Sequence, residues 1–171
     1  MKSSAEKSSA DRGEQAARIA AVLDAQHVMS LATCGPEGPH AANVFYARYG
    51  FALVWVSDPA SRHSAHIAAQ PRVAVTIAGD FSDFPEVRGL QIVGDACALT
   101  GRDEVERARK CLEARFPFLR SVKNGSASLR EALARARYYR LIPRCIVLID
   151  NRRGLGFKET MEFAVERPQA V

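Results

Sequence analysis

A serine, an arginine and a histidine occupy positions 61–63, where a run of apolar residues gives way to a turn. Ser57 lies four residues earlier. Hydroxyl, guanidinium and imidazole groups all donate hydrogen bonds that suit phosphate oxygens. If Ser61 begins a helix, the free N–H groups of its first turn favour an anion as well. Ser57, Ser61, Arg62 and His63 are therefore candidates for a phosphate site. The pattern alone favours a simpler alternative, in which Ser61 only caps the helix and Arg62 is solvated.

Cysteine spacing argues against a metal centre. The four cysteines, at positions 34, 97, 111 and 145, contain no C-x-x-C pair, and the histidines follow no zinc pattern. We therefore expect free, mostly buried thiols in a reducing compartment. No metal ligands and no catalytic acid or base are identified from the sequence.

Length and composition place the chain among single-domain globular proteins. It has 171 residues, 47% of them hydrophobic and 25% charged. Its longest unbroken apolar run, 51–56, is far shorter than the roughly 20 residues of a membrane span. The polar N-terminus does not resemble a secretory signal, so a cytoplasmic protein without a membrane partner is expected.

The positive charge is concentrated in one segment. Residues 102–144 carry twelve Arg and Lys against five acids, in a chain whose net charge is +5. A basic segment can bind nucleic acid. No recognition motif accompanies this one, so we favour a solvated helical face or the surroundings of an anionic ligand, with no nucleic-acid partner.

The expected elements form a mixed fold. Residues 1–10 are expected to be a disordered tail, and 12–26 an amphipathic helix capped by Asp11. Short alternating segments indicate antiparallel strands. Gly89 and Gly94 suggest a bend or bulge in one of them, and Pro143 implies an edge or a bulge in another. We expect an α+β fold, an antiparallel β-barrel of six to seven strands with flanking helices. The expected strands are 27–34, 40–48, 51–58, 72–78, 87–99, 138–150 and 157–165, and the other helices are 61–69, 100–116 and a segment around 129–136. Thr100 with Asp103 resembles a capping box that opens the second of these helices.

The order of these motifs resembles the flavin-binding split-barrel family typified by pyridoxamine 5′-phosphate oxidase. Family members have a strand, a Ser-Arg-Lys helix start, Asn-Pro and an alternating apolar strand. Here Ser61-Arg62-His63, Gln70-Pro71 and the segment 72–75 occupy those places, and 89–94 is similar to the next strand. The resemblance covers roughly residues 14–165. The chain ends in RPQAV and lacks the family enzyme's C-terminal Arg-Leu-x-Pro, so vitamin B6 phosphate is not the expected substrate.

The resemblance implies a flavin mononucleotide (FMN) site between two subunits of a homodimer. Backbone groups of Asn43, Val44 and Phe45 would line the flavin ring, while Ser57, Ser61, Arg62 and His63 would hold the phosphate. The Gln91 amide is a candidate partner for a flavin carbonyl. For Asn43 and Gln91 a plain surface position is equally open.

The resemblance also implies a function. Residues 11–171 would form an FMN-binding split-barrel domain, acting as an oxidoreductase on an unidentified small molecule. Three alternatives remain: a flavin-binding or storage protein without turnover, a haem-binding protein and a deazaflavin-dependent protein. Trp55, in an apolar strand, is more typical of a core residue than of a stacking partner for the cofactor.

Overall fold

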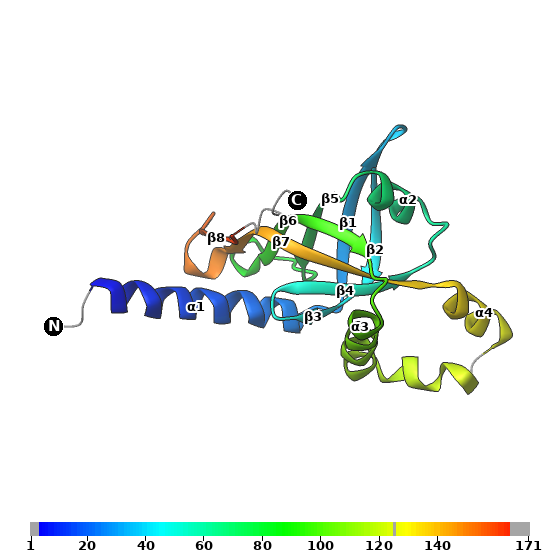
Figure 1. Ribbon diagram of the computed structural model, residues 1–171. Coiled ribbons are helices and arrows are strands. Elements are labelled where there is room, and N and C mark those ends of the chain that lie inside the picture. Colours follow the sequence, from blue (N-terminus) through cyan, green and yellow to red (C-terminus); the bar gives the residue numbers. More distant parts are fainter. Residues whose placement is uncertain (1–3, 125, 165–171) are drawn as a thin grey trace, which may run out of the picture.

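The computed structural model describes residues 4–124 and 126–164, which form an α+β fold around one curled antiparallel sheet (Figure 1). Seven strands follow the order β2-β1-β5-β6-β7-β4-β3, and an eighth, β8, pairs with β7. The expected split barrel is confirmed. Its strands are β1 (Val28–Gly35), β2 (Gly38–Phe45), β3 (Ala47–Tyr49), β4 (Ala52–Ser57), β5 (Arg72–Ala78), β6 (Arg88–Ala98), β7 (Arg137–Asp150) and β8 (Lys158–Glu162).

Four α-helices and three short 3-10 helices flank the sheet. In Figure 1, α2 lies above the sheet and α3 below it, while α1 extends away on one side. The helices are α1 (Ser4–Ala25), α2 (Arg62–Ala69), α3 (Arg102–Arg115) and α4 (Ala127–Arg135), with 3-10 helices η1 (Phe84–Glu86), η2 (Pro117–Asn124) and η3 (Asn151–Arg153).

Strict alternation along the strands builds the core. In β1 and β5, every second side chain is buried and the ones between are exposed. The buried side chains of both strands pack with those of β4, β6 and β7 into one cluster. Trp55 is fully buried there and stacks on Tyr139, with ring centroids 5.5 Å apart, so it is a core residue as expected.

A bulge bends the longest pair of strands. The register of β6 and β7 shifts between Val93 and Gly94, which leaves Arg144 without an opposite residue beside Pro143. A Cβ atom on Gly94 would collide with the backbone of Ile142, so glycine permits the close approach. Beyond the bend β7 changes its second neighbour: residues 137–141 pair with β4 and residues 145–149 pair with β8. The bulge expected from Gly94 and Pro143 is present.

The first helix is longer than expected. It begins at Ser4, so residues 4–10 are helical where a disordered tail was expected, and Asp11 lies inside the helix instead of capping it. Its buried side chains include Ile19 and Leu23, which join the barrel core. The guanidinium of Arg115 donates to the carbonyl oxygens of Leu23, Asp24 and Gln26 at its C-terminal end.

Helix α1 also forms hydrogen bonds to the last strand, β8. Arg18 donates to both carboxylate oxygens of Glu159 on β8, at 2.9 and 2.7 Å. The side-chain amide of Gln15 donates to the carbonyl oxygen of Thr160 at 3.0 Å. These contacts hold β8 against the helix as well as against β7.

Two further expectations are wrong. The single strand expected over 40–48 is two strands, because Tyr46 interrupts it; its backbone N–H donates to the carbonyl of His27, and its hydroxyl donates to that of Leu23. Thr100 does not cap α3: the N-cap is Gly101, without a side-chain hydrogen bond. The expectation of mostly buried thiols is also wrong: all four cysteines are free, but Cys34 and Cys97 are exposed on the outward positions of β1 and β6, and Cys111 and Cys145 are only half-buried. None of the described helices is long and apolar enough to cross a membrane.

Candidate functional site

The turn between β4 and α2 brings three candidate residues together. After Ser57 ends β4, the carboxylate of Asp58 accepts the N–H of Ala60 at 2.8 Å, and its carbonyl accepts the N–H of Ser61 at 3.0 Å. Ser61 then caps α2, with its hydroxyl accepting from the N–H of Ser64. This tight reversal places the end of the strand beside the first turn of the helix.

The imidazole of His63 joins the two serines. Its Nε2 lies 2.9 Å from the Ser57 hydroxyl and 3.1 Å from the Ser61 hydroxyl, and Ser61 in turn donates to Ser64 at 2.8 Å. A hydroxyl donates to a neutral imidazole nitrogen and accepts from a protonated one. The network therefore accommodates both protonation states of His63.

Two more histidines complete a cluster. The ring of His40, from β2, is parallel to that of His63 within 2°, with centroids 6.4 Å apart, and it meets His66 edge-on at 6.0 Å. The buried His66 is fixed by a 3.1 Å hydrogen bond between its Nδ1 and the hydroxyl of Thr33. Burial lowers the pKa of His63 below its usual value, and repulsion from His40 and His66 lowers it further.

A glycine allows the β1–β2 hairpin to close on this helix. A Cβ atom on Gly35 would overlap the ring of His66. Beyond it, in the turn, the carboxylate of Glu37 lies 3.2 Å from the guanidinium of Arg62. Arg62 is exposed and stands at the mouth of the site, where its present partner is a carboxylate.

The other predicted residues lie away from this cluster. Asn43 and Gln91 are exposed on the outer face of the sheet, where they end one row that crosses β2, β1, β5 and β6 through Ser30 and Thr76. The Ser30 hydroxyl donates to Asn43 Oδ1 at 2.7 Å. Three strand spacings separate the ends of the row, about 14 Å. Both amides are therefore open to solvent on this face of the subunit.

Val44 and Phe45 complete the predicted set. The side chain of Val44 turns inward against the core. Phe45 is 56% exposed and its ring meets Phe116 and Phe118 at 5.3 and 6.4 Å, at the end of β2 remote from α2. Among the described contacts, the residue of β2 that reaches the α2 cluster is His40, which sequence reasoning missed.

Cavities flank these elements. The largest described cleft, about 380 Å³, follows the flank of α2 opposite the hairpin, a size that suits a small molecule. Its walls are mostly small and apolar: Pro59, Ser64, Ala65, Ile67, Ala68, Pro71, Ala96, Cys97, Ala98, Arg137 and Tyr139.

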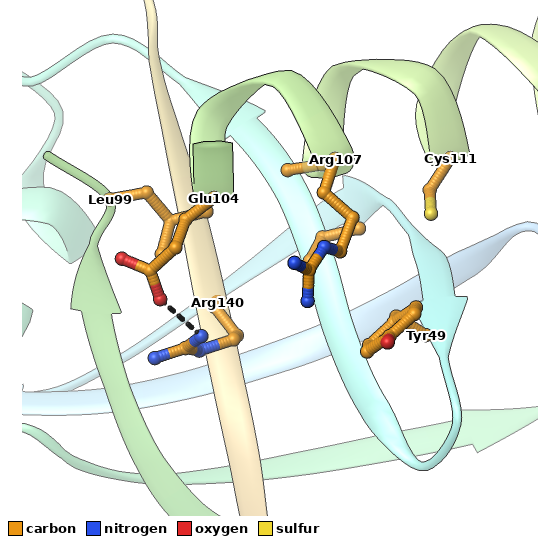
Figure 2. Close-up of a pocket in the computed structure, with 8 residues that line it drawn as sticks. Tyr49, Leu99, Glu104, Arg107, Cys111 and Arg140 are labelled. Atoms are coloured by element: carbon orange, nitrogen blue, oxygen red, sulfur yellow. Dashed lines mark hydrogen bonds and ion pairs between the residues drawn. The ribbon is translucent and has the colours of Figure 1, made fainter. Parts of the chain in front are cut away.

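A second pocket lies under α3 (Figure 2). There Arg140 is paired with Glu104 at 2.6 Å, and the Arg107 guanidinium lies 5.2 Å from the ring centre of Tyr49. At about 50 Å³ this pocket holds one or two waters, far less than a flavin ring needs. Among the described residues, no group of three or more His, Cys, Asp or Glu side chains is arranged so that it could hold a metal ion.

Several arginines of the basic segment form ion pairs, some with acids of the segment and some with acids from elsewhere in the fold. Arg115 and Arg144 each approach an acid outside the segment, Asp24 and Asp95, and inside it Arg109 bonds to two acids of its own helix. The segment is therefore held by ion pairs on several elements rather than presented as one uniformly free basic face.

Known proteins resemble this chain in sequence and in structure. The family model described as pyridoxamine 5′-phosphate oxidase matches residues 16–141. A UPF0306 protein of Photorhabdus laumondii is 35% identical over 104 residues, 59% of this chain and 71% of that protein.

Two solved structures share the fold. A heme binding protein from Mycobacterium smegmatis superposes with a TM-score of 0.65 and 24% identity, over 87% of this chain and 57% of that one. An FAD-binding protein from Mesorhizobium loti superposes with a TM-score of 0.59 and 18% identity, over 75% of this chain and 89% of that one.

Proposed function

Since the chain belongs to the pyridoxamine 5′-phosphate oxidase family, we propose that it is an FMN-binding flavoprotein that oxidises or reduces a small molecule. The observation that carries the proposal is the group of donors at the start of α2. There two hydroxyls, an imidazole and a guanidinium surround the free N–H groups of a helix N-terminus. This donor set suits a phosphate monoester.

Each residue of the group has a distinct role in the proposal. The Ser57 and Ser61 hydroxyls donate to phosphate oxygens, and His63 adds a charged donor when it is protonated. Arg62 supplies a planar fork that stays charged at any working pH. Ser57, Ser61 and His63 are half-buried, and their hydrogen bonds with one another already position them before the ligand arrives.

The flavin ring is proposed to lie at a homodimer interface. The outer face of the sheet carries a row of small side chains, Ala41, Ala32, Ala74 and Val93, which lie opposite one another across four strands. Because these side chains are small, they permit close approach of a second sheet, and Val93 is 43% exposed among them. The polar row of Asn43 and Gln91 runs beside it and offers amide groups to the edge of a flavin from either subunit.

Bound flavin supplies the electron chemistry of such an enzyme. The chain's own contribution is to hold the phosphate, to orient the ring and to exclude water between the two subunits. A flavin carrier without turnover uses the same groups, and a steady-state assay with candidate electron donors separates the two functions.

The proposal is tested by the spectrum and ligand preference of the purified protein. We expect flavin absorption bands, and fluorescence titration should show FMN binding at least about tenfold more tightly than riboflavin, because only FMN carries the phosphate. A Soret band would instead support a haem protein. A protein that stays colourless and binds neither flavin, or that prefers deazaflavin, would overturn the proposal.

A further inference from the structure

The side chain of His40 faces the proposed phosphate site from a different element than the other donors. His40 belongs to β2, opposite Thr33 of β1, and its ring is parallel to that of His63 of α2. The hairpin is held against α2 by the packing of Gly35 on His66. The two rings are therefore kept in register by the fold and not by a bond between them.

The titratable and charged groups near His40 and His63 come from several elements. His66 of α2 meets His40 edge-on, and the Nδ1 atom of His66 is hydrogen-bonded to the hydroxyl of Thr33. In the part of the chain that the structure describes, neither nearby carboxylate forms an ion pair or hydrogen bond with His40 or His63. The carboxylate of Glu37 is paired with Arg62. The carboxylate of Asp58 accepts a hydrogen bond in the turn before α2 and lies 3.9 Å from Arg135.

Without an anion nearby, protonation of His63 is unfavourable, because its ring is partly removed from water and is repelled by positive charge on His40 and His66. A phosphate dianion beside the helix N-terminus reverses the balance, because a nearby opposite charge favours the charged form of each ring. Binding of the anion and binding of protons then reinforce each other.

We propose that His40 joins His63 in binding the phosphate of FMN, and that this pair takes up a proton as the phosphate enters. The inference rests on the proposed FMN site at the start of α2 and deepens it. The site discriminates a phosphate monoester from uncharged flavin by its coupling to pH, which a lysine in place of His63 would not provide.

Calorimetry measures the proton directly. FMN is titrated at pH 7.5 into the full chain in two buffers of different ionisation enthalpy, with riboflavin as the matched ligand. At this pH the free phosphate monoester, with a second pKa near 6, is almost entirely dianionic, so an uptake reports on the protein. We expect about 0.5–1 proton taken up per FMN and none with riboflavin. Equal heats in both buffers with FMN would overturn the inference.

Variants assign the proton to the pair. In His40→Gln we expect the uptake to fall by about half or more and FMN to bind about 5–10-fold more weakly, with riboflavin unchanged. His27→Gln, whose ring packs on Phe116, is the matched control and should behave as the unmodified chain. An unchanged uptake in His40→Gln would assign the proton elsewhere and overturn the role of His40.

A measurement on the unmodified chain covers the case in which His40→Gln does not fold. The FMN affinity should weaken toward tenfold per pH unit as pH rises through the pKa values of the liganded pair, and riboflavin affinity should stay flat. A flat FMN profile overturns the inference but leaves the FMN site standing. Loss of all flavin binding in the unmodified chain overturns the proposed function itself.

Discussion

Glu37 and Arg62 form an ion pair, 3.2 Å apart, that joins the β1–β2 turn to the first residue of α2. Both side chains are exposed, at 74% and 55%. The Glu37 carboxylate is thus paired with the same guanidinium, that of Arg62, which the proposed phosphate would bind. It makes a weak intramolecular competitor, since exposed pairs contribute about 0–1 kcal/mol.

Removal of this competitor should strengthen phosphate binding. In Glu37→Gln we expect FMN affinity to rise about two- to fivefold, with riboflavin affinity unchanged, because Arg62 is released. Fluorescence titration at low salt measures both. Glu131→Gln, on exposed α4, removes the same charge at a distance and should change neither. Equal gains in both variants would point to net charge instead of the pair.

Removal of Arg62 should weaken FMN binding at every pH. We expect Arg62→Ala to lose about 1.5–3 kcal/mol of binding free energy, the size of a charge-assisted hydrogen bond. Titrations at pH 6 and pH 8 should give the same loss, because the guanidinium does not titrate in this range. Arg102→Ala, at the exposed start of α3, serves as control. If riboflavin affinity falls equally, Arg62 does not contact the phosphate.

Lysine at position 63 should remove the pH dependence contributed by that position. Burial holds the pKa of His63 below its usual value in the free protein, so the ring is neutral above that value and gains its charge only with the phosphate. His63→Lys should bind FMN comparably near pH 6 and more tightly near pH 8, where lysine remains charged. Affinities measured at both values check this. No gain at pH 8 would make His63 a bystander on the helix.

A large charged side chain on the outer face should break the proposed dimer. Ala74 is exposed at the centre of the row of small residues, so Ala74→Arg leaves the core of the subunit intact. Sedimentation should show a monomer, and both FMN and riboflavin affinities should fall, because the ring site is lost while the phosphate site remains. Ala114→Arg, on exposed α3, is the control and should stay dimeric.

Arg115 should contribute strongly to stability. Its guanidinium donates to carbonyl groups at the end of α1 and lies 5.5 Å from the ring centre of Tyr46. Arg115→Ala leaves these acceptors without their donor, and we expect a loss of about 2–3 kcal/mol in the free energy of unfolding. Urea denaturation measures it, against Arg102→Ala, which should lose less than about 0.5 kcal/mol. A similarly small loss for Arg115→Ala would show that water replaces the donor.

The sequence predicts those strands and helix starts that depend only on neighbouring residues. Alternation along residues 28–35 and 72–78 needs no knowledge of the partner strand, and Ser61 is a helix cap by its own chemistry. The sequence predicts a start of helix α1 at residue 12, whereas the helix begins at Ser4. Residues 4–10 show no apolar periodicity in sequence, although their Ala, Glu and Lys favour helix. Thr100 is not the cap, since the helix begins at Arg102 and Gly101 takes the N-cap position.

The part of the site that sequence reasoning missed depends on strand pairing. His40 lies 23 residues before His63, and nothing near it in sequence signals a function. Only the register of β1 with β2, and the closure of Gly35 on His66, bring its ring to α2. Conversely, Asn43 and Gln91 are typical binding residues by type, yet the alternation of β2 and β6 turns both to the outer face.

The fastening of β8 to α1 bears on self-association. Without β8, residues 145–149 of β7 would present a row of unpaired N–H and C=O groups, the kind of open edge through which sheets of separate molecules join. The short β8 satisfies this row, and it turns the charged side chains of Lys158 and Glu162 outward along the new edge. By fixing β8 to α1, the bond between Arg18 and Glu159 keeps this edge of β7 covered.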